Sequence, residues 1–352
     1  MTKDSENTEI KRPVTVSDLA RDLNLSVSTV SRAFYPNAPI APHTRAAVLE
    51  YAKKVGYRTN LFAKNLVTQS TQIVGVVAAD LTNPYYPEVV SKLTALLQES
   101  GINVMLSTAV EPQKIDESVD ILLNYRPNAI IILAANSVTA ARERCDQAGI
   151  PCIFFNRLSS DGRGYGISCD NWRGGVMAAN YFIKLGHKRL GYVSAFPDTS
   201  TNQDRKGGFL FQAKKAGLAT PYIFDAGAFS YKNGFKAALE YKAIGSPPTA
   251  VFCANDILAI GFMEGLEANC GVNVPQDVSI IGFDDIEMAS WPSHNLTTIA
   301  QPTDKMLERT VEIVKKISFK KNTFIPISKT IFIHPGPVII RDTATSPKDS
   351  TL

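Results

Sequence analysis

The sequence predicts an α/β protein in which a small helical head precedes a larger body of two lobes, each built on a parallel sheet. Three observations support this class. From residue 73 onward, short apolar runs rich in β-branched residues alternate with helical patterns, as in parallel sheets covered by helices on both faces. Residues 13–58 contain helical patterns only. The length of 352 residues also exceeds what one compact core usually holds.

The composition is that of an ordinary globular protein, with 45% apolar and 20% charged residues. It excludes a fibrous chain, a largely disordered chain and a small disulfide scaffold. The five cysteines never form Cys-x-x-Cys, so we expect buried thiols in a reducing cytoplasm and neither a disulfide framework nor a zinc site. No apolar run approaches the roughly 20 residues of a membrane span, and the N-terminus is polar. We therefore expect a cytoplasmic protein without a membrane partner, a metal or a cofactor.

The net charge of +4 is unevenly distributed along the chain. Residues 11–70 contain nine basic and three acidic residues, residues 1–10 have a net charge of −2, and the rest of the chain is neutral. A basic head before a neutral body suggests a module that binds a polyanion. A basic surface without such a partner is the alternative interpretation.

Residues 13–34 predict two short helices around a tight turn. Thr15 is the expected N-cap of the first helix, with Asp18 as its acidic partner. The apolar stripe of that helix consists of Val16, Leu19, Ala20 and Leu23. Ser26 is expected to cap the second helix. A third helix is predicted from Pro42 to about Val55, with Gly56 as its C-terminal stop.

The second helix has two distinct faces. One face is expected to pack on the first helix through Val30, Ala33 and Phe34. The opposite face consists of Val27, Ser28, Ser31 and Arg32. Two helices around a tight turn, supported by a third, form the helix-turn-helix unit that reads DNA. A solvated helical hairpin without a target is the alternative.

The exposed face of the second helix suits the major groove, because its side chains are short except for that of Arg32. Arg32 can bond guanine O6 and N7 together, which is the most common specific contact to a base. Ser28 can bond a base edge, and Val27 can contact a thymine methyl group. Ser31 suits a phosphate.

Several segments of the head carry a resemblance to a known family. They are Val14-Thr-Val-Ser-Asp-Leu-Ala, Ser26-Val-Ser-Thr-Val-Ser-Arg32, Thr44-Arg45, Gly56-Tyr57 and Asn60 through Leu66. This head resembles that of the lactose-repressor/galactose-repressor (LacI/GalR) family of bacterial regulators. The resemblance implies DNA contacts from Thr15, Val27, Ser28, Thr29, Ser31, Arg32, Asn60, Ala63, Lys64 and Leu66.

Asn60-Leu-Phe-Ala-Lys-Asn-Leu66 resembles the hinge helix of this family. About seven residues are too few for a stable helix in water, so we expect this segment to order only when two copies meet on DNA. The resemblance implies that Leu66 wedges between base pairs from the minor groove; a linker leucine packed on the body is the alternative. Thr59 replaces the usual proline and Phe62 a smaller residue, so hinge packing is expected to differ.

The body is predicted to contain an open parallel sheet in each lobe, with a crossing near residues 160–172. The expected strands are Ile73–Ala79, Asn103–Thr108, Ala129–Ala134, Pro151–Phe155, Arg189–Ser194, Ala250–Cys253 and Ser279–Phe283. Helices are expected between them, for example at Tyr86–Glu99, Trp172–Leu185 and Asp256–Ala268.

No motif of the body indicates catalysis. Gly162-x-Gly-x-Gly166 is expected in a loop and has the wrong spacing for dinucleotide binding. The sequence contains neither Gly-x-Ser-x-Gly nor His-Glu-x-x-His, and its four histidines are isolated from one another, so we expect capping or surface roles for them. An enzyme acting in a cleft remains an alternative.

The body also resembles the LacI/GalR family. The segments that carry this resemblance are Asn83-Pro-Tyr-Tyr, Asp170-Asn-Trp-Arg-Gly-Gly, Leu185-Gly-His, Ala254-Asn-Asp256, Gly282-Phe-Asp-Asp285 and Leu296-Thr-Thr-Ile-Ala-Gln301. They imply a fold like that of type I periplasmic sugar-binding proteins, with two lobes, three crossovers and a ligand in the cleft.

The expected organisation follows from these segments. It consists of a flexible arm (1–12), the helix-turn-helix domain (13–58), the hinge helix and linker (59–71), an effector-binding and dimerisation domain (72–345) and a flexible tail (346–352). Lobe 1 would comprise about 72–170 and 302–328, and lobe 2 about 171–301 and 329–345.

Ligands of parallel sheets bind at the carboxyl ends of the strands, and several distinctive side chains fall there. Those that follow predicted strands are Tyr85, Tyr86, Asn156, Arg157, Asn255 and Asp284. The resemblance adds Arg205 and Phe229. The set suits a polyhydroxylated ligand, because Asp284 accepts hydroxyl bonds, Arg205 and Asn255 donate them, and Phe229 or Tyr86 can stack on C–H groups.

Each of these residues also has a structural alternative. They are a loop cap for Asp284 or Asp285, core packing for Tyr85 and Phe229, an ion pair for Arg157 and Arg205, and a helix cap for Asn255. Asp170 is expected to be structural.

Only eleven residues follow Arg341, and they contain no leucine heptad, so we expect a dimer rather than a coiled-coil tetramer. A dimer would read a pseudo-palindromic double-stranded DNA operator through two heads. The sequence thus predicts a nucleoid-associated transcription repressor controlled by a sugar-like effector. A non-sugar metabolite or a protein partner as the signal, and a sugar-binding protein without a regulatory role, are the alternatives.

Overall fold

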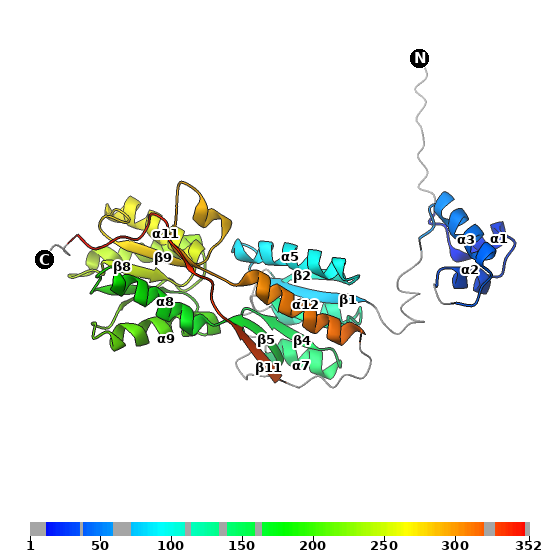
Figure 1. Ribbon diagram of the computed structural model, residues 1–352, viewed down its shortest axis with the longest axis horizontal. Helices are drawn as coiled ribbons and strands as arrows, with labels where there is room; N and C mark the ends of the chain where they lie inside the picture. Colours follow the sequence, from blue (N-terminus) through cyan, green and yellow to red (C-terminus); the bar gives the residue numbers. More distant parts are fainter. Residues whose placement is uncertain are drawn as a thin grey trace, which may run out of the picture. The chain divides into compact units, whose positions relative to one another are not determined.

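The computed structural model describes residues 12–35, 38–58, 72–109, 114–133, 139–158, 164–319 and 328–348. It divides into two compact units, residues 1–71 and 72–352, which correspond to the head and the body (Figure 1). The hinge segment 59–71 lies outside the described residues. The predictions for Thr59, Asn60, Phe62, Ala63, Lys64 and Leu66 therefore have no structural counterpart here.

The head contains α1 (Val16–Asp22), α2 (Val27–Ala33) and α3 (Pro42–Lys54), which confirms the predicted three helices. Thr15 and Asp18 form the predicted capping box, and Ser26 caps α2 by accepting a bond from the Thr29 amide at 3.1 Å. The small core consists of Leu19, Ala20, Val30, Ala33, Val48 and Ala52. Packing of α2 against this core determines which of its side chains reach solvent.

The first lobe of the body is a six-stranded sheet in the order β11-β5-β4-β3-β1-β2, with every pair parallel. Its strands are β1 (Ile73–Ala79), β2 (Asn103–Ala109), β3 (Ala129–Leu133), β4 (Cys152–Phe155), β5 (Gly164–Cys169) and β11 (Ser328–Ile333). Its helices are α5 (Tyr85–Glu99), α6 (Ile115–Leu123), α7 (Thr139–Gln147) and α12 (Thr303–Phe319). Helix α5 packs with α12, and α6 packs with α7.

The second lobe has the order β12-β10-β9-β8-β6-β7, in which only the β10–β12 pair is antiparallel. Its strands are β6 (Leu190–Ser194), β7 (Tyr222–Asp225), β8 (Ala250–Cys253), β9 (Ser279–Asp284), β10 (Thr298–Ala300) and β12 (Val338–Ile339). Its helices are α8 (Asn171–Lys184), α9 (Ser200–Lys215), α10 (Tyr231–Ala237) and α11 (Asp256–Gly265), with short helical turns at Ala238–Ala243, Leu266–Cys270 and Glu287–Ser290. Figure 1 shows α8 and α9 on one face of this sheet and α11 on the other.

The strand order reverses between β1 and β3 in the first lobe and between β6 and β8 in the second. Ligands of such sheets bind outside the carboxyl ends of the strands at these switch points. We therefore expect a ligand of the body to bind at the carboxyl ends of β1 and β3 in the first lobe and of β6 and β8 in the second.

The seven predicted strands are confirmed as β1, β2, β3, β4, β6, β8 and β9, and two expectations are wrong. Gly164 and Gly166 lie in β5 and not in a loop. A side chain at Gly166 would come within 2.4 Å of Leu158, so close packing and not turn formation explains this glycine. Residues 329–333 pair with β5 in the first lobe, so the last crossover comes after them and not at 328.

The five cysteines are all buried, as predicted. Among the described residues, no helix combines the length and apolar character that a membrane crossing requires. The same residues contain no cluster of three or more His, Cys, Asp or Glu side chains able to hold a metal ion.

His187 contradicts the expected surface role of the histidines, because its side chain is buried in the second lobe. Its Nδ1 lies 3.0 Å from the Thr249 hydroxyl, and its Nε2 lies 2.8 Å from the Thr345 carbonyl oxygen. Ser279 also bonds the Thr345 carbonyl, at 2.9 Å. The C-terminal segment is therefore held to the sheet partly through a histidine.

Lowering the pH should destabilise the body, because protonation of His187 buries a charge. Burial lowers the pKa of His187 from its usual 6.5, so the unfolded chain takes up a proton before the folded chain does, and the free energy of unfolding falls as pH decreases through 6.5. In urea titrations between about pH 7 and about pH 5, His187→Gln should lose part of this pH dependence. An unchanged dependence would assign it to other groups.

Candidate functional site

The predicted site residues that the structure describes lie in two places, one in each unit. In the head, the outer face of α2 is accessible: Val27, Ser28 and Arg32 are exposed, and Val27 exposes 47% of its surface. Thr29 and Ser31 are half-buried, while Val30 and Ala33 are buried against the core. The predicted division of α2 into a packed face and a solvent face is therefore confirmed.

Thr15 is engaged within the head. Its hydroxyl donates to Asp18 Oδ2 at 2.7 Å and accepts from the Asp18 amide at 3.3 Å. The bond from the Thr15 hydroxyl, a second bond that the Thr15 amide donates to Asp18 Oδ2 at 3.0 Å, and a 2.9 Å contact from Arg12 hold the pKa of Asp18 to about 2. Thr15 thus caps the start of α1. A contact with a DNA phosphate would have to be made by a Thr15 hydroxyl that is already bonded to Asp18.

Arg45 is a residue whose role the sequence analysis did not identify. Its guanidinium donates to the carbonyls of Ala33 at 3.0 Å, Tyr35 at 2.5 Å and Ala38 at 2.8 Å. All three carbonyls lie at or just after the end of α2. Arg45 on α3 therefore holds the end of α2 and the following turn.

Removing the three hydrogen bonds of Arg45 should destabilise the head. Arg45→Met is expected to lower its unfolding free energy by about 1.5–3 kcal/mol, the range for hydrogen bonds from a charged donor. Hydrogen exchange of the α2 amides in the full chain measures the change. Lys54→Met, an exposed position on the same helix, serves as the control and should leave exchange unchanged. Equal effects of the two substitutions would rule out a specific stabilisation of α2 by the hydrogen bonds of Arg45.

In the body, the first lobe contributes four buried side chains to the cleft, Tyr85, Tyr86, Asn156 and Arg157. Asn156 follows β4 with a positive φ of 70° and donates to the Tyr86 hydroxyl at 3.2 Å. The Thr303 hydroxyl lies 3.4 Å from that of Tyr85. Burial raises the pKa of both tyrosines, so their hydroxyls are neutral hydrogen-bonding groups at pH 7.

The second lobe places Arg205 at the centre of its side of the cleft, with 2% of its surface exposed. Its guanidinium donates to Asn171 Oδ1 at 2.8 Å and to the Ala254 carbonyl at 2.5 Å, and it lies over the Phe283 ring at 3.6 Å. Its Nη2 is 3.4 Å from Asp284 Oδ1. The ion-pair alternative for Arg205 is therefore present in the structure, and this contact is the longest of the three polar contacts that Arg205 makes here.

Asp284 ends β9 with a φ of 121°, a conformation that is unusual for a residue with a side chain. Burial raises the pKa of its carboxyl group, against the opposing effects of Arg205 and of hydrogen bonds from Gln301 and Asn255. Asn255 also caps α11 by accepting from the Leu258 amide at 3.2 Å. It therefore has the predicted structural role and faces the cleft as well.

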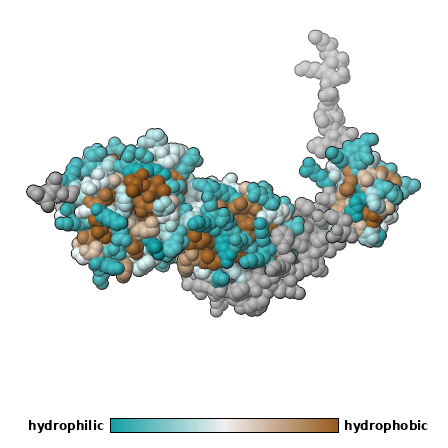
Figure 2. All heavy atoms as spheres, in the orientation of Figure 1, coloured by the Kyte–Doolittle hydropathy of each residue, from teal (hydrophilic) through white to brown (hydrophobic). Residues whose placement is uncertain are grey.

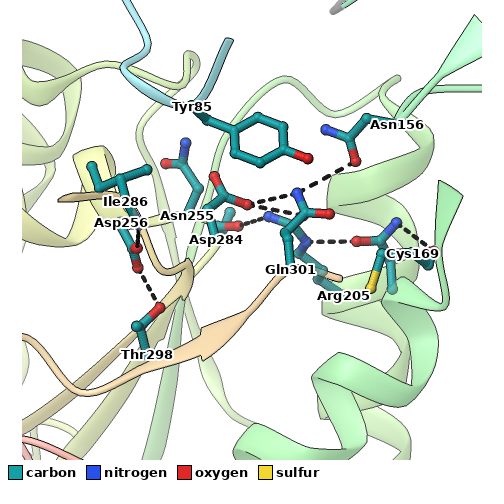
Figure 3. A network of polar contacts seen from close by, with 12 residues as sticks. Tyr85, Asn156, Cys169, Arg205, Asn255, Asp256, Asp284, Ile286, Thr298 and Gln301 are labelled. Atoms are coloured by element: carbon teal, nitrogen blue, oxygen red, sulfur yellow. Dashed lines mark hydrogen bonds and ion pairs between the residues drawn. The ribbon is translucent and has the colours of Figure 1, made fainter. Parts of the chain in front are cut away.

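Gln301 joins the two lobes. Its amide group donates to Asp284 at 2.9 Å and lies 3.4 Å from Asn156 Oδ1. Figure 3 shows the side chains of Tyr85, Asn156, Asp284 and Gln301 pointing toward one another. Gln301 Oε1 is buried without a hydrogen-bond partner among the described residues. The sequence analysis gave Gln301 no site role, because it follows β10, a three-residue strand that was not predicted.

A second contact between the lobes involves Arg157 and Phe229. The guanidinium of Arg157 lies 4.9 Å from the centroid of the Phe229 ring, and both side chains are buried. The eight predicted cleft residues thus lie in one polar and aromatic cluster between the lobes. Asp170, as expected, is structural: it caps α8 by accepting from the Arg173 amide at 3.0 Å.

Comparisons with known proteins agree with this arrangement. Residues 179–343 match the family described as periplasmic binding protein-like domain. The HTH-type transcriptional regulator GalS of Salmonella typhimurium is 30% identical over 307 residues, which cover 85% of this chain and 88% of GalS.

Two solved structures also match. The lac repressor dimer bound to operator and an anti-inducer superposes with a TM-score of 0.83 at 22% identity, covering 95% of this chain and all of that chain. A LacI family regulator from Enterococcus faecium with bound ribose has a TM-score of 0.67 at 25% identity, covering 78% of this chain and all of the other. The chain belongs to the LacI/GalR family of transcriptional regulators.

Proposed function

We propose that this protein is a sequence-specific transcription repressor that binds a pseudo-palindromic operator as a dimer and responds to a small polar effector. The observation that carries the proposal is the presence in one chain of an exposed recognition face on α2 and a buried polar cluster between two lobes. Such a protein would act in the cytoplasm, on the nucleoid. We propose no catalytic role for the cleft, because its polar groups are arranged to bind and no nucleophile–base pair is among them.

In this proposal the head contacts DNA through the major groove. Arg32 and Ser28 would read base edges, Val27 would contact a thymine methyl group, and Thr15, Thr29 and Ser31 would contact phosphates. Asn60, Ala63, Lys64 and Leu66 would form the hinge contacts. The proposed domain boundaries assign DNA contact to the head and hinge and effector binding to the body. The last boundary between the lobes is moved past residue 333.

The effector would be a sugar or a sugar derivative. Tyr85, Tyr86, Asn156, Arg157, Arg205, Phe229, Asn255, Asp284 and Gln301 provide both donors and acceptors next to aromatic rings, a combination that suits hydroxyl groups on an apolar ring. Ribose bound to the Enterococcus faecium relative supports this class. Gln301 Oε1 supplies an acceptor that the described part of the chain leaves unused.

The effector would act by replacing contacts between the lobes. Gln301 connects Asn156 of one lobe with Asp284 of the other. A ligand that bonds these groups would therefore change the free energy of the arrangement in which the two lobes are joined through Gln301. A different angle between the lobes would alter the spacing of the two hinges and thereby the affinity for operator.

A thermal-shift screen of the purified protein against sugars, sugar phosphates, polyols, sugar acids and purines tests this proposal. A ligand at 100 times its dissociation constant should stabilise the body by about 2.7 kcal/mol. Gln301→Ala should weaken binding of any such ligand, while Lys315→Ala on the exposed surface of α12 should not. A shift produced by purines alone would replace the sugar class, and turnover of the ligand would refute a purely binding role.

A further inference from the structure

We propose that the outer face of α8 and α9 is a docking surface for an acidic amphipathic helix of a partner protein. This α8/α9 face consists of Trp172, Arg173 and Lys184 of α8 and Phe211, Lys214 and Lys215 of α9, all of which are exposed. The inference does not depend on the proposed operator or effector.

Three pairs of contacts show that the two helices lie close together and run in the same direction. A Cβ at Gly175 would lie 2.0 Å from the Arg205 carbonyl oxygen, and a Cβ at Gly208 would lie 1.9 Å from that of Trp172. Further along, Gln212 donates to Asn180 at 2.7 Å. On both helices the residues of the two glycine contacts precede those of the Gln212–Asn180 bond, so the C-terminal ends of the two helices lie at the same end of the face.

Two exposed aromatic rings lie side by side on this face, Trp172 from the start of α8 and Phe211 from the second half of α9. Trp172 is 45% and Phe211 50% exposed, and their ring centroids are 5.8 Å apart. A Cβ at Gly207 would lie 2.6 Å from the Trp172 ring, so the indole lies against the surface of α9 and is held there. Figure 2 shows that hydrophobic residues reach the surface of the body in patches among hydrophilic ones. A fixed tryptophan beside a phenylalanine is a typical anchor of a protein interface.

The C-terminal half of the face is basic. Lys184, Lys214 and Lys215 lie in the last turns of the two helices, where a lysine complements the helix dipole. The dipole does not explain Arg173, which lies in the first turn. Within α8 and α9 the exposed and half-buried charges are five basic (Arg173, Lys184, Lys206, Lys214, Lys215) and one acidic (Asp204), although residues 71–352 are neutral overall. This face is therefore a positive region on a neutral body.

These features select one kind of partner. The thirteen residues from Trp172 to Lys184 span about 18 Å along the helix, which suits a partner helix of three to four turns. A second copy of the same face carries the same positive charge, so the two faces would repel each other. A DNA duplex would use the lysines and leave the aromatic pair without a role. A helix with acidic residues opposite the lysines and apolar residues opposite Trp172 and Phe211 matches both the charge and the aromatic pair of this face.

A synthetic peptide tests the proposal with the full-length chain. The probe is a fluorescein-labelled 16-residue helical peptide with leucines on one face and glutamates elsewhere, and the matched probe replaces every glutamate by lysine. The chain contains two tryptophans, so the variant Trp291→Phe leaves Trp172 as the reporter. We expect saturable anisotropy and an emission shift with the acidic peptide, no binding of the basic one, and weaker binding when salt shortens the Debye length from about 10 to about 3 Å.

Two sets of charge reversals provide the matched comparison. Lys184→Glu, Lys214→Glu and Lys215→Glu together should weaken binding at least about tenfold. Lys305→Glu, Lys315→Glu and Lys316→Glu, the same charge change on exposed positions of α12, should leave it within about twofold. Trp172→Ala should also weaken binding at least about tenfold. Melting temperatures verify that each variant is folded.

Several results would overturn the proposal. Equal weakening by both sets of reversals would indicate attraction by net charge alone, and absence of saturable binding would mean that the face has no affinity for such a helix. Binding of a random-sequence DNA duplex that requires the three lysines but not Trp172 would identify a nucleic-acid surface instead. A change of oligomeric state in sedimentation with the α8/α9 reversals would identify a second copy as the occupant.

Discussion

Arg205→Ala is expected to lower the unfolding free energy of the body by about 3–5 kcal/mol, because it removes the stronger of the two arginine charges that favour the buried carboxylate of Asp284 and leaves only that of Arg157. The loss is a large part of the 5–15 kcal/mol that stabilises a typical domain. Arg205 also donates to Asn171 and to the Ala254 carbonyl, and both acceptors would lose their donor. Urea unfolding of the full chain, followed by a probe in the body, measures the change.

The pH dependence of the stability of Arg205→Ala distinguishes the loss of the ion pair from the loss of packing. Burial already raises the pKa of Asp284 with Arg205 present, and removing the guanidinium should raise it further. A carboxyl group whose folded pKa lies above its unfolded value of 3.8 lowers stability as pH rises through that range. The loss in Arg205→Ala should therefore be greatest at neutral pH and smaller near about pH 4. Adding Asp284→Asn should recover part of the stability at neutral pH; no recovery would attribute the loss to the cavity alone.

Arg32→Ala is expected to weaken operator binding by about 1–3 kcal/mol per head and to relax the preference at one base position in each half-site. The exposed position of Arg32 on α2, with Val27 and Ser28 on the same face, leaves the guanidinium able to reach a guanine edge. Selection of bound sequences from a random DNA pool, for the native chain and the variant, measures both effects.

Lys53→Ala is the matched control for this substitution, because it removes an exposed basic side chain from α3 of the same unit. It should change the affinity for all sequences by a similar factor and leave the selected motif unchanged. If Arg32→Ala produced the same uniform loss, its role would be a phosphate contact and not base recognition.

The helices of the head were predictable from local signals. Thr15 with Asp18, Ser26, Pro42 and Gly56 mark helix ends through capping and backbone preference, which depend on a few neighbouring residues, and the structure has the ends where these residues place them. The long apolar strands were predictable for the same reason. The missed strands β5, β7, β10, β11 and β12 are short, rich in glycine or partly exposed, so their existence depends on the neighbouring strand.

In the cleft, too, some residues could be predicted from local sequence and others could not. Asn156, Asn255 and Asp284 could be assigned to the cleft because each follows a recognisable strand, and parallel strands bring such positions to one edge of a sheet. Gln301 could not be assigned a role, since Asn156 approaches it only when elements distant in the sequence pack together. Arg45 could not be assigned one either, since its carbonyl partners come within reach only when α3 packs beside the end of α2.

The sequence by itself determined the α/β class, the helical head, the two faces of α2 and most of the side chains of the cleft, because these depend on periodicity, capping and position relative to a strand. Only the tertiary structure decided which of those side chains bond one another, that Gln301 connects the lobes, that β11 belongs to the first sheet, and that Trp172 lies exposed against α9. These features depend on contacts between segments up to about 170 residues apart, and such contacts follow from packing, which no local pattern encodes.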